Sequence, residues 1–136
     1  MPLTLRVGLI GCGDWGRNHA RVLSRLGVLE AVGDQTPERA ALFAREFDCA
    51  DIGTETLLNS PEIDAVVIAA APHEQAALAL RALRAGKHVL VEKPMAMNAA
   101  DAENLCDAGQ VAGRVAMTGL IMQFHPGFIA LKRLIR

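Results

Sequence analysis

A glycine-rich loop between an apolar run and a helical stretch constrains the fold of this chain more than any other feature. The apolar run covers residues 5–10, and the loop that follows reads Gly11-Cys12-Gly13-Asp14-Trp15-Gly16. A second apolar segment ends at Val32-Gly33-Asp34. Glycine loops of this spacing also occur as ordinary turns, but here a strand precedes the loop, and a helix, a second strand and an acidic residue follow it. The pattern therefore predicts a βαβ unit that binds a dinucleotide.

Each glycine of the loop has a separate role in this interpretation. Gly11 permits a tight turn off the strand, Gly13 leaves no Cβ between the backbone and a pyrophosphate, and Gly16 lets the helix approach the strand. The helix N-terminus offers free N–H groups and a positive dipole end to the phosphates. Asp34 follows at about 20 residues, where a carboxylate can accept both hydroxyls of an adenosine ribose.

The other loop residues, Cys12, Asp14 and Trp15, are expected to neighbour the cofactor. Cys12 and Trp15 are interpreted as shape-filling contacts. A helix dipole that lowers the pKa of Cys12 would make the thiol reactive, whereas burial would make it inert, and we expect the second.

The residues around Asp34 bear on the choice of cofactor. A carboxylate at this position repels a 2′-phosphate, and the next residues, Gln35-Thr36-Pro37, supply no cation, so NAD is favoured over NADP. Arg39 lies one turn into the next helix. It either reaches a 2′-phosphate or is an ordinary solvated helix charge.

Composition limits the class of protein. A chain of 136 residues, 51% hydrophobic and 21% charged, fits one globular domain over residues 1–136. Its net charge of −1 and dispersed basic residues suggest neither a nucleic-acid groove nor a membrane-binding face. Three cysteines without CxxC or Cys/His spacing predict no disulfide framework and no metal site. With no signal peptide or long apolar run, a cytoplasmic location is expected.

Strand and helix patterns alternate along the chain, as in a parallel sheet with helices on both faces. Strands are expected at residues 5–10, 29–33, 50–52, 64–69, 88–91 and 114–118. Helices are expected at about 15–26, 37–47 (capped by Thr36), 54–58, 74–84, 98–113 (capped by Asn98) and 126–136. Right-handed crossovers then give an α/β doubly wound sheet of six strands, a Rossmann fold in the order 3-2-1-4-5-6. Ligands bind such sheets at the carboxyl ends of strands one and four.

A lysine follows the fifth strand in Val91-Glu92-Lys93-Pro94. At the lip of the crevice, Lys93 could polarise a carbonyl or lower the pKa of an alcohol. Alternatively, Glu92 and Lys93 only pair with each other on a loop.

Four segments together resemble the N-terminal domain of the glucose-fructose oxidoreductase and inositol dehydrogenase (Gfo/Idh/MocA) family. These segments are the glycine loop, Glu62-Ile63-Asp64-Ala65-Val66-Val67-Ile68-Ala69, Ala85-Gly86-Lys87-His88-Val89 and Glu92-Lys93-Pro94. Phe124-His125-Pro126, followed by residues 131–135, resembles the family's cross-over helix. The resemblance covers nearly the whole chain and is nearest to the branch that acts on nucleotide-linked sugars.

The resemblance implies hydride transfer between a sugar-type alcohol or ketone and the nicotinamide of NAD(H). Carried onto this sequence, it makes Lys93 the residue that orients or polarises the reacting oxygen. Glu92 would lie beside the nicotinamide ribose, and a cis peptide bond would precede Pro94.

The chain departs from the family pattern at two cofactor positions. Ala70-Ala71-Pro72-His73 stands where the family often has Thr-Pro and then a histidine, and the register places Gln75 at the histidine position. His73 either replaces that histidine or is an exposed loop residue. Gln123 stands where many relatives carry an arginine beside the cofactor. We carry Ala70, Pro72, His73, Gln75 and Gln123 over as cofactor contacts.

Family members continue into a second domain that binds substrate and supplies a catalytic histidine, and residues 1–136 are expected to lack it. Of the four histidines, His19 is expected in a packing or surface role. The chain would bind NAD(H) with little or no dehydrogenase activity alone; alternatively, it is a binding or interaction module completed by a partner chain. A third option is a small-molecule-binding regulator on the same fold. The apolar residues Leu120, Ile121, Met122, Phe124 and Phe128 predict self-association.

Overall fold

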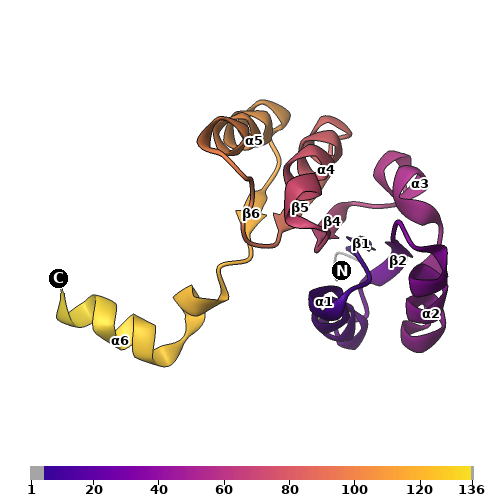
Figure 1. Cartoon of the computed structure of the whole chain (residues 1–136), viewed down its shortest axis with the longest axis horizontal. Helices are drawn as coiled ribbons and strands as arrows, with labels where there is room; N and C mark the ends of the chain where they lie inside the picture. Colours follow the sequence, from indigo (N-terminus) through magenta and orange to yellow (C-terminus); the bar gives the residue numbers. More distant parts are fainter. Residues whose placement is uncertain (1–4, 136) are drawn as a thin grey trace.

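The computed structural model describes residues 5–135 and shows one six-stranded parallel sheet in the order β3-β2-β1-β4-β5-β6 (Figure 1). The strands are β1 (Val7–Ile10), β2 (Leu29–Gly33), β3 (Ala50–Asp51), β4 (Ala65–Ile68), β5 (His88–Val91) and β6 (Ala116–Thr118). The helices are α1 (Asp14–Arg25), α2 (Pro37–Phe47), α3 (Gly53–Asn59), α4 (Pro72–Arg84), α5 (Ala99–Ala112), the 3₁₀ turn η1 (Ile121–Phe124) and α6 (Pro126–Leu134). The predicted fold class and strand order are confirmed.

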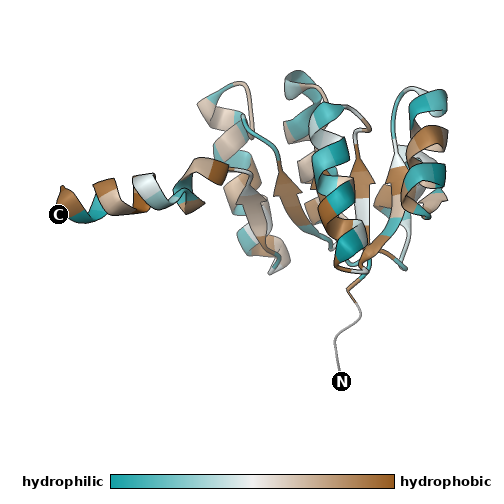
Figure 2. Cartoon of the chain, turned by 90° about the horizontal axis from the view of Figure 1, so that it is seen from below, coloured by the Kyte–Doolittle hydropathy of each residue, from teal (hydrophilic) through white to brown (hydrophobic). Residues whose placement is uncertain are grey.

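Two hydrophobic clusters lie on opposite faces of the sheet, because side chains alternate along each strand. On β1, Leu9 points to the face covered by α1 and α2, where it packs near Phe43. Ile10 points to the face covered by α3, α4 and α5, where it joins Leu57 and Leu83. The strands are largely apolar, as expected for parallel strands buried on both sides (Figure 2).

Several element boundaries differ from the predictions for local reasons. α4 begins at Pro72 instead of 74, because proline suits the first helical position. β6 begins at Ala116 instead of 114, because the Arg114 N–H closes the end of α5 on the Gly109 carbonyl. η1 was not predicted, since four residues carry no usable periodicity. The predicted end of the last helix at Arg136 lies outside the described residues.

The two predicted helix caps behave differently. Asn98 accepts the Asp101 N–H at 2.9 Å and caps α5 as expected. Thr36 occupies the cap position of α2, but its side chain makes no cap hydrogen bond. Its Oγ1 accepts from Arg39 Nη2 at 2.9 Å instead, so Thr36 is the cap residue as predicted, but it caps α2 through its backbone carbonyl, which accepts the Arg39 N–H at 3.0 Å.

The C-terminal segment leaves the body of the domain. η1 and α6 project away from the sheet beyond β6, with apolar residues along their length (Figures 1 and 2). Ile121, Phe124 and Leu134 are 64%, 67% and 84% exposed. In the part of the chain that the structure describes, no helix combines the length and apolarity needed to cross a membrane.

Candidate functional site

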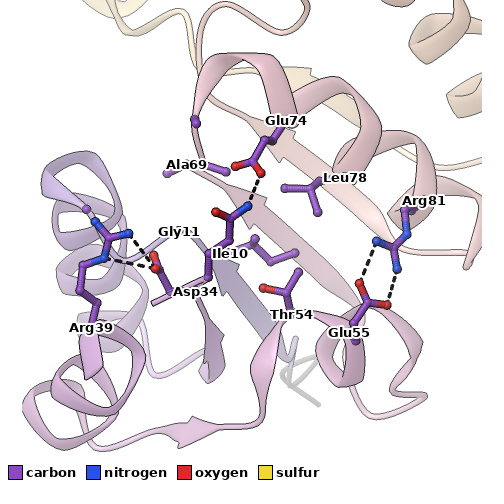
Figure 3. Close-up of a pocket in the computed structure, with 14 residues that line it drawn as sticks. Ile10, Gly11, Asp34, Arg39, Thr54, Glu55, Ala69, Glu74, Leu78 and Arg81 are labelled. Carbon is purple, nitrogen blue, oxygen red and sulfur yellow. Dashed lines mark hydrogen bonds and ion pairs between the residues drawn. The ribbon is translucent and has the colours of Figure 1, made fainter. Parts of the chain in front are cut away.

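A cavity of about 520 Å³ opens at the carboxyl ends of β1, β2 and β4 (Figure 3). Six predicted cofactor residues line it: Gly11, Gly13, Asp34, Gln35, Arg39 and Ala70. This is the position at which a doubly wound sheet binds the adenosine half of a dinucleotide.

The glycine loop is shaped by close backbone contacts. Gly11 has a φ of +102°, and a Cβ there would lie 2.3 Å from the Ala69 carbonyl oxygen. A Cβ on Gly16 would lie 1.9 Å from the Gly11 carbonyl oxygen. A Cβ on Gly13 would meet nothing within 4 Å, although Gly13 lines the cavity. Gly11 and Gly16 are therefore required by the fold, whereas the small size of Gly13 leaves room for a ligand.

Asp34 is fixed at the floor of the cavity by backbone groups. Its Oδ2 accepts the Cys12 N–H at 2.7 Å, and its Oδ1 accepts the Thr36 N–H at 2.7 Å. Burial alone would raise the pKa of Asp34, but these two hydrogen bonds and the Arg39 guanidinium together hold it below its ordinary value. The carboxylate is thus ionised and able to accept ribose hydroxyls.

Three side-chain pairs line the cavity. Arg39 donates to Asp34 Oδ1 through Nη2 at 2.9 Å and Nε at 3.2 Å, so it is more than a solvated charge. Arg81 on α4 makes a two-pronged ion pair with Glu55 on α3 (Figure 3). Gln35 donates to Glu74. Sequence reasoning missed Glu55 and Arg81, because their shared position depends on how α3 and α4 face each other.

Lys93 lies at a second cavity, of about 300 Å³, between β5 and η1. Gln123 also lines this cavity, with the apolar residues Ile121 and Phe128. Lys93 Nζ lies 5.9 Å from the centre of the Trp15 ring, within the range of a cation–π contact. The Lys93–Pro94 peptide bond is cis, as predicted.

Glu92 contacts α1, a relationship that sequence reasoning missed. His19 Nε2 lies 2.8 Å from Glu92 Oε1, although the residues are 73 positions apart. His19 follows Trp15 by four residues, so both side chains lie on one side of α1. That spacing was the available signal, but it does not say which part of the sheet the side chains face.

The remaining predicted contacts line neither cavity. Pro72 and His73 lie exposed at the start of α4, and Asp14 lies exposed at the start of α1. Gln75 is buried and donates to the Pro94 carbonyl at 2.8 Å, so it supports the Glu92-Lys93-Pro94 turn from below.

Cys12 is buried behind the glycine loop. Burial first, and the Asp34 carboxylate second, raise the pKa of its thiol to about 12. The thiol is therefore protonated at neutral pH, in line with the inert role expected. Within residues 5–135, no cluster of histidine, cysteine or acidic side chains is arranged to hold a metal ion.

Residues 5–120 match the family model described as "Oxidoreductase family, NAD-binding Rossmann fold", the model of the Gfo/Idh/MocA family. The chain belongs to the Gfo/Idh/MocA family. As in that description, its Rossmann domain binds a nicotinamide dinucleotide. The resemblance seen in the sequence motifs is thereby confirmed.

Three Gfo/Idh/MocA relatives illustrate the range of the family. Inositol 2-dehydrogenase 2 of Saccharopolyspora erythraea is 34% identical over 98% of this chain and 41% of its own length. The structure of UDP-N-acetylglucosamine 3-dehydrogenase from Acidithiobacillus ferrooxidans superposes with a TM-score of 0.89 at 34% identity, covering 97% of this chain and 44% of that protein. The structure of a 3-ketoreductase from Actinomadura kijaniata, in complex with NADP and TDP-benzene, superposes with a TM-score of 0.88 at 30% identity, covering 96% of this chain and 42% of that protein. The chain thus spans about two fifths of these relatives.

Proposed function

We propose that this domain binds NAD(H) in preference to NADP(H). The ionised Asp34 at the floor of the cavity carries the proposal, since it is held in place by two backbone N–H groups and would repel a 2′-phosphate. Arg39 is engaged by Asp34, so a phosphate would have to draw the guanidinium away from the carboxylate. Because the structure of the 3-ketoreductase from Actinomadura kijaniata contains NADP, the preference of this chain between NAD and NADP should be measured directly.

Isothermal titration of the purified chain with NAD and NADP, with Asp34→Ala beside it, tests the assignment. Wild type should bind NAD more tightly than NADP, and the variant should lose about tenfold or more in NAD affinity. Wild type that prefers NADP, or a variant that keeps its NAD affinity, would contradict the role of Asp34. Binding of neither cofactor would favour an interaction module completed by a partner chain, for which the exposed apolar residues of η1 and α6 are suited.

The reaction we propose for the complete site is oxidation of a sugar-type alcohol, or reduction of the matching ketone, with the nicotinamide exchanging hydride. Two of the named relatives are an inositol 2-dehydrogenase and a UDP-N-acetylglucosamine 3-dehydrogenase. Lys93 would polarise or orient the reacting oxygen, from its position between the Trp15 ring and the second cavity. Substrate contacts would come mainly from a further domain outside residues 1–136.

The chain alone is therefore expected to bind cofactor with little or no turnover. The formation of NADH from myo-inositol or UDP-N-acetylglucosamine, followed by absorbance, checks this point. Steady turnover by the purified 136-residue chain would refute it.

All three cysteines are free thiols, which suits the cytoplasmic location that we also propose.

A further inference from the structure

The Glu92 carboxylate is held on three sides. Oε1 lies 2.8 Å from His19 Nε2, and Oε2 accepts the backbone N–H of Lys93 at 3.2 Å. On the third side, a Cβ on Gly119 would lie 3.0 Å from Oε1. The side chains of His19 and Glu92 are only 23% and 11% exposed. Glu92 therefore has little freedom to turn while His19 is in place.

The position of this pair in the sheet assigns it to one half of the cofactor site. The adenosine cavity lies over β1, β2 and β4, with Asp34 and Arg39 on its β2 side. A dinucleotide crosses the switch point of a doubly wound sheet and places its other half over the opposite strands. β5 lies on that side, and Glu92 and Lys93 follow its last residue, Val91, so the pair faces the nicotinamide end.

We propose that His19 is a positioning residue for the nicotinamide end, which rests on the proposed binding of NAD(H). Its Nε2 lies within hydrogen-bond distance of the Glu92 carboxylate, and Glu92 Oε2 in turn accepts the backbone N–H of Lys93. Trp15, one turn earlier on α1, faces the Lys93 ammonium. Two successive turns of the pyrophosphate-binding helix thus hold two consecutive residues of the turn after β5.

Two ligands separate this role from a general effect on folding. NADH contains both halves of the dinucleotide, whereas ADP lacks the nicotinamide and its ribose. Trp15 is the single tryptophan of the chain, so energy transfer from its ring to bound NADH reports on the site. ADP affinity is measured by isothermal titration, and thermal unfolding is followed for each variant.

His19→Leu should weaken NADH binding about tenfold, because the Glu92 carboxylate loses the partner that orients it, and leave ADP affinity within about twofold. His19→Gln keeps an N–H donor and should recover most of the NADH affinity. Asn18→Ala, on the exposed side of the same helix, is the matched control and should change neither ligand.

The possible failures are distinguishable. Wild type that binds neither NADH nor ADP contradicts the proposed function itself. Equal losses for both ligands in His19→Leu, or no loss for either, overturn the positioning role while the cofactor site stands. A His19→Gln variant as weak as His19→Leu also overturns it, because the donor would then have no part in binding.

Discussion

The Cys12 N–H donates to Asp34 Oδ2 at 2.7 Å, which joins the glycine loop to the carboxylate at the end of β2. The backbone of the glycine loop and the Asp34 carboxylate are therefore one unit. A shift of the loop would move Asp34, and the loss of Asp34 would free the loop. Substitutions on either side should accordingly affect the binding of the whole adenosine half.

Gly13→Ala should separate ligand binding from folding. A Cβ at this position meets nothing within 4 Å, so the melting temperature should stay close to that of wild type, while NAD affinity falls about tenfold or more as the methyl group enters the phosphate space. Calorimetry of unfolding and of binding measures both. Gly16→Ala is the contrasting variant: its Cβ would lie 1.9 Å from the Gly11 carbonyl oxygen, and it should be markedly destabilised. Unchanged NAD affinity in Gly13→Ala would mean that the phosphates lie elsewhere.

Arg39→Ala should sharpen cofactor selectivity. The guanidinium bonds to Asp34 and lines the cavity, so its removal should leave NAD affinity within about threefold and weaken NADP further. Competition titrations with both cofactors give the ratio, and Arg45→Ala, near the far end of the same helix, controls for lost charge. If the affinities for NAD and NADP fall equally, Arg39 contacts a part of the ligand that both cofactors share, and the prediction is wrong.

Asp34 should make stability depend on acid pH. Its folded pKa lies below the ordinary value of 3.8, so its ionised form stabilises the fold above about pH 4, and this contribution is lost as pH falls through the folded pKa. Asp34→Asn should cost about 1–2 kcal/mol at neutral pH and show a smaller loss on acidification. Urea unfolding between about pH 3 and 7 measures the difference. Parallel curves for the two proteins would contradict this account.

The three thiols should react at very different rates. Burial raises the pKa of Cys12 to about 12 and that of Cys49 to about 11, whereas Cys106 is exposed on α5. A disulfide reagent near pH 8 should therefore modify one thiol rapidly, and Cys106→Ser should remove that fast phase. Rapid modification of Cys12 would show that the glycine loop opens in solution.

Self-association through η1 and α6 remains a prediction that light scattering can check. The exposed apolar side chains there, Ile121 and Phe124 among them, favour a dimer or a larger species. Phe124→Ser should shift the distribution toward monomer and leave the sheet intact. A monodisperse wild-type monomer would count against the prediction.

The sequence predicted what depends on local pattern and handedness. Strand order followed from right-handed crossovers, and the positions of Gly11 and Asp34 followed from turn and strand-end geometry. It did not predict contacts that depend on how a helix is rotated against the sheet. His19 reaches Glu92 only because of the rotation of α1, and Gln75 turns inward to Pro94 instead of toward the cavity.

Helix α3 presses against the sheet at two strand glycines. A Cβ on Gly33 would lie 2.7 Å from the Thr54 nitrogen, and one on Gly8 would lie 2.6 Å from Leu57 Cδ2. A side chain at Gly33 would meet the α3 backbone and push the helix outward, whereas one at Gly8 would have to displace the Leu57 side chain. Substitutions among relatives should therefore spare Gly33 and fall more often on the exposed Glu55–Arg81 pair that lines the cavity, where a change of side chain leaves the backbone in place.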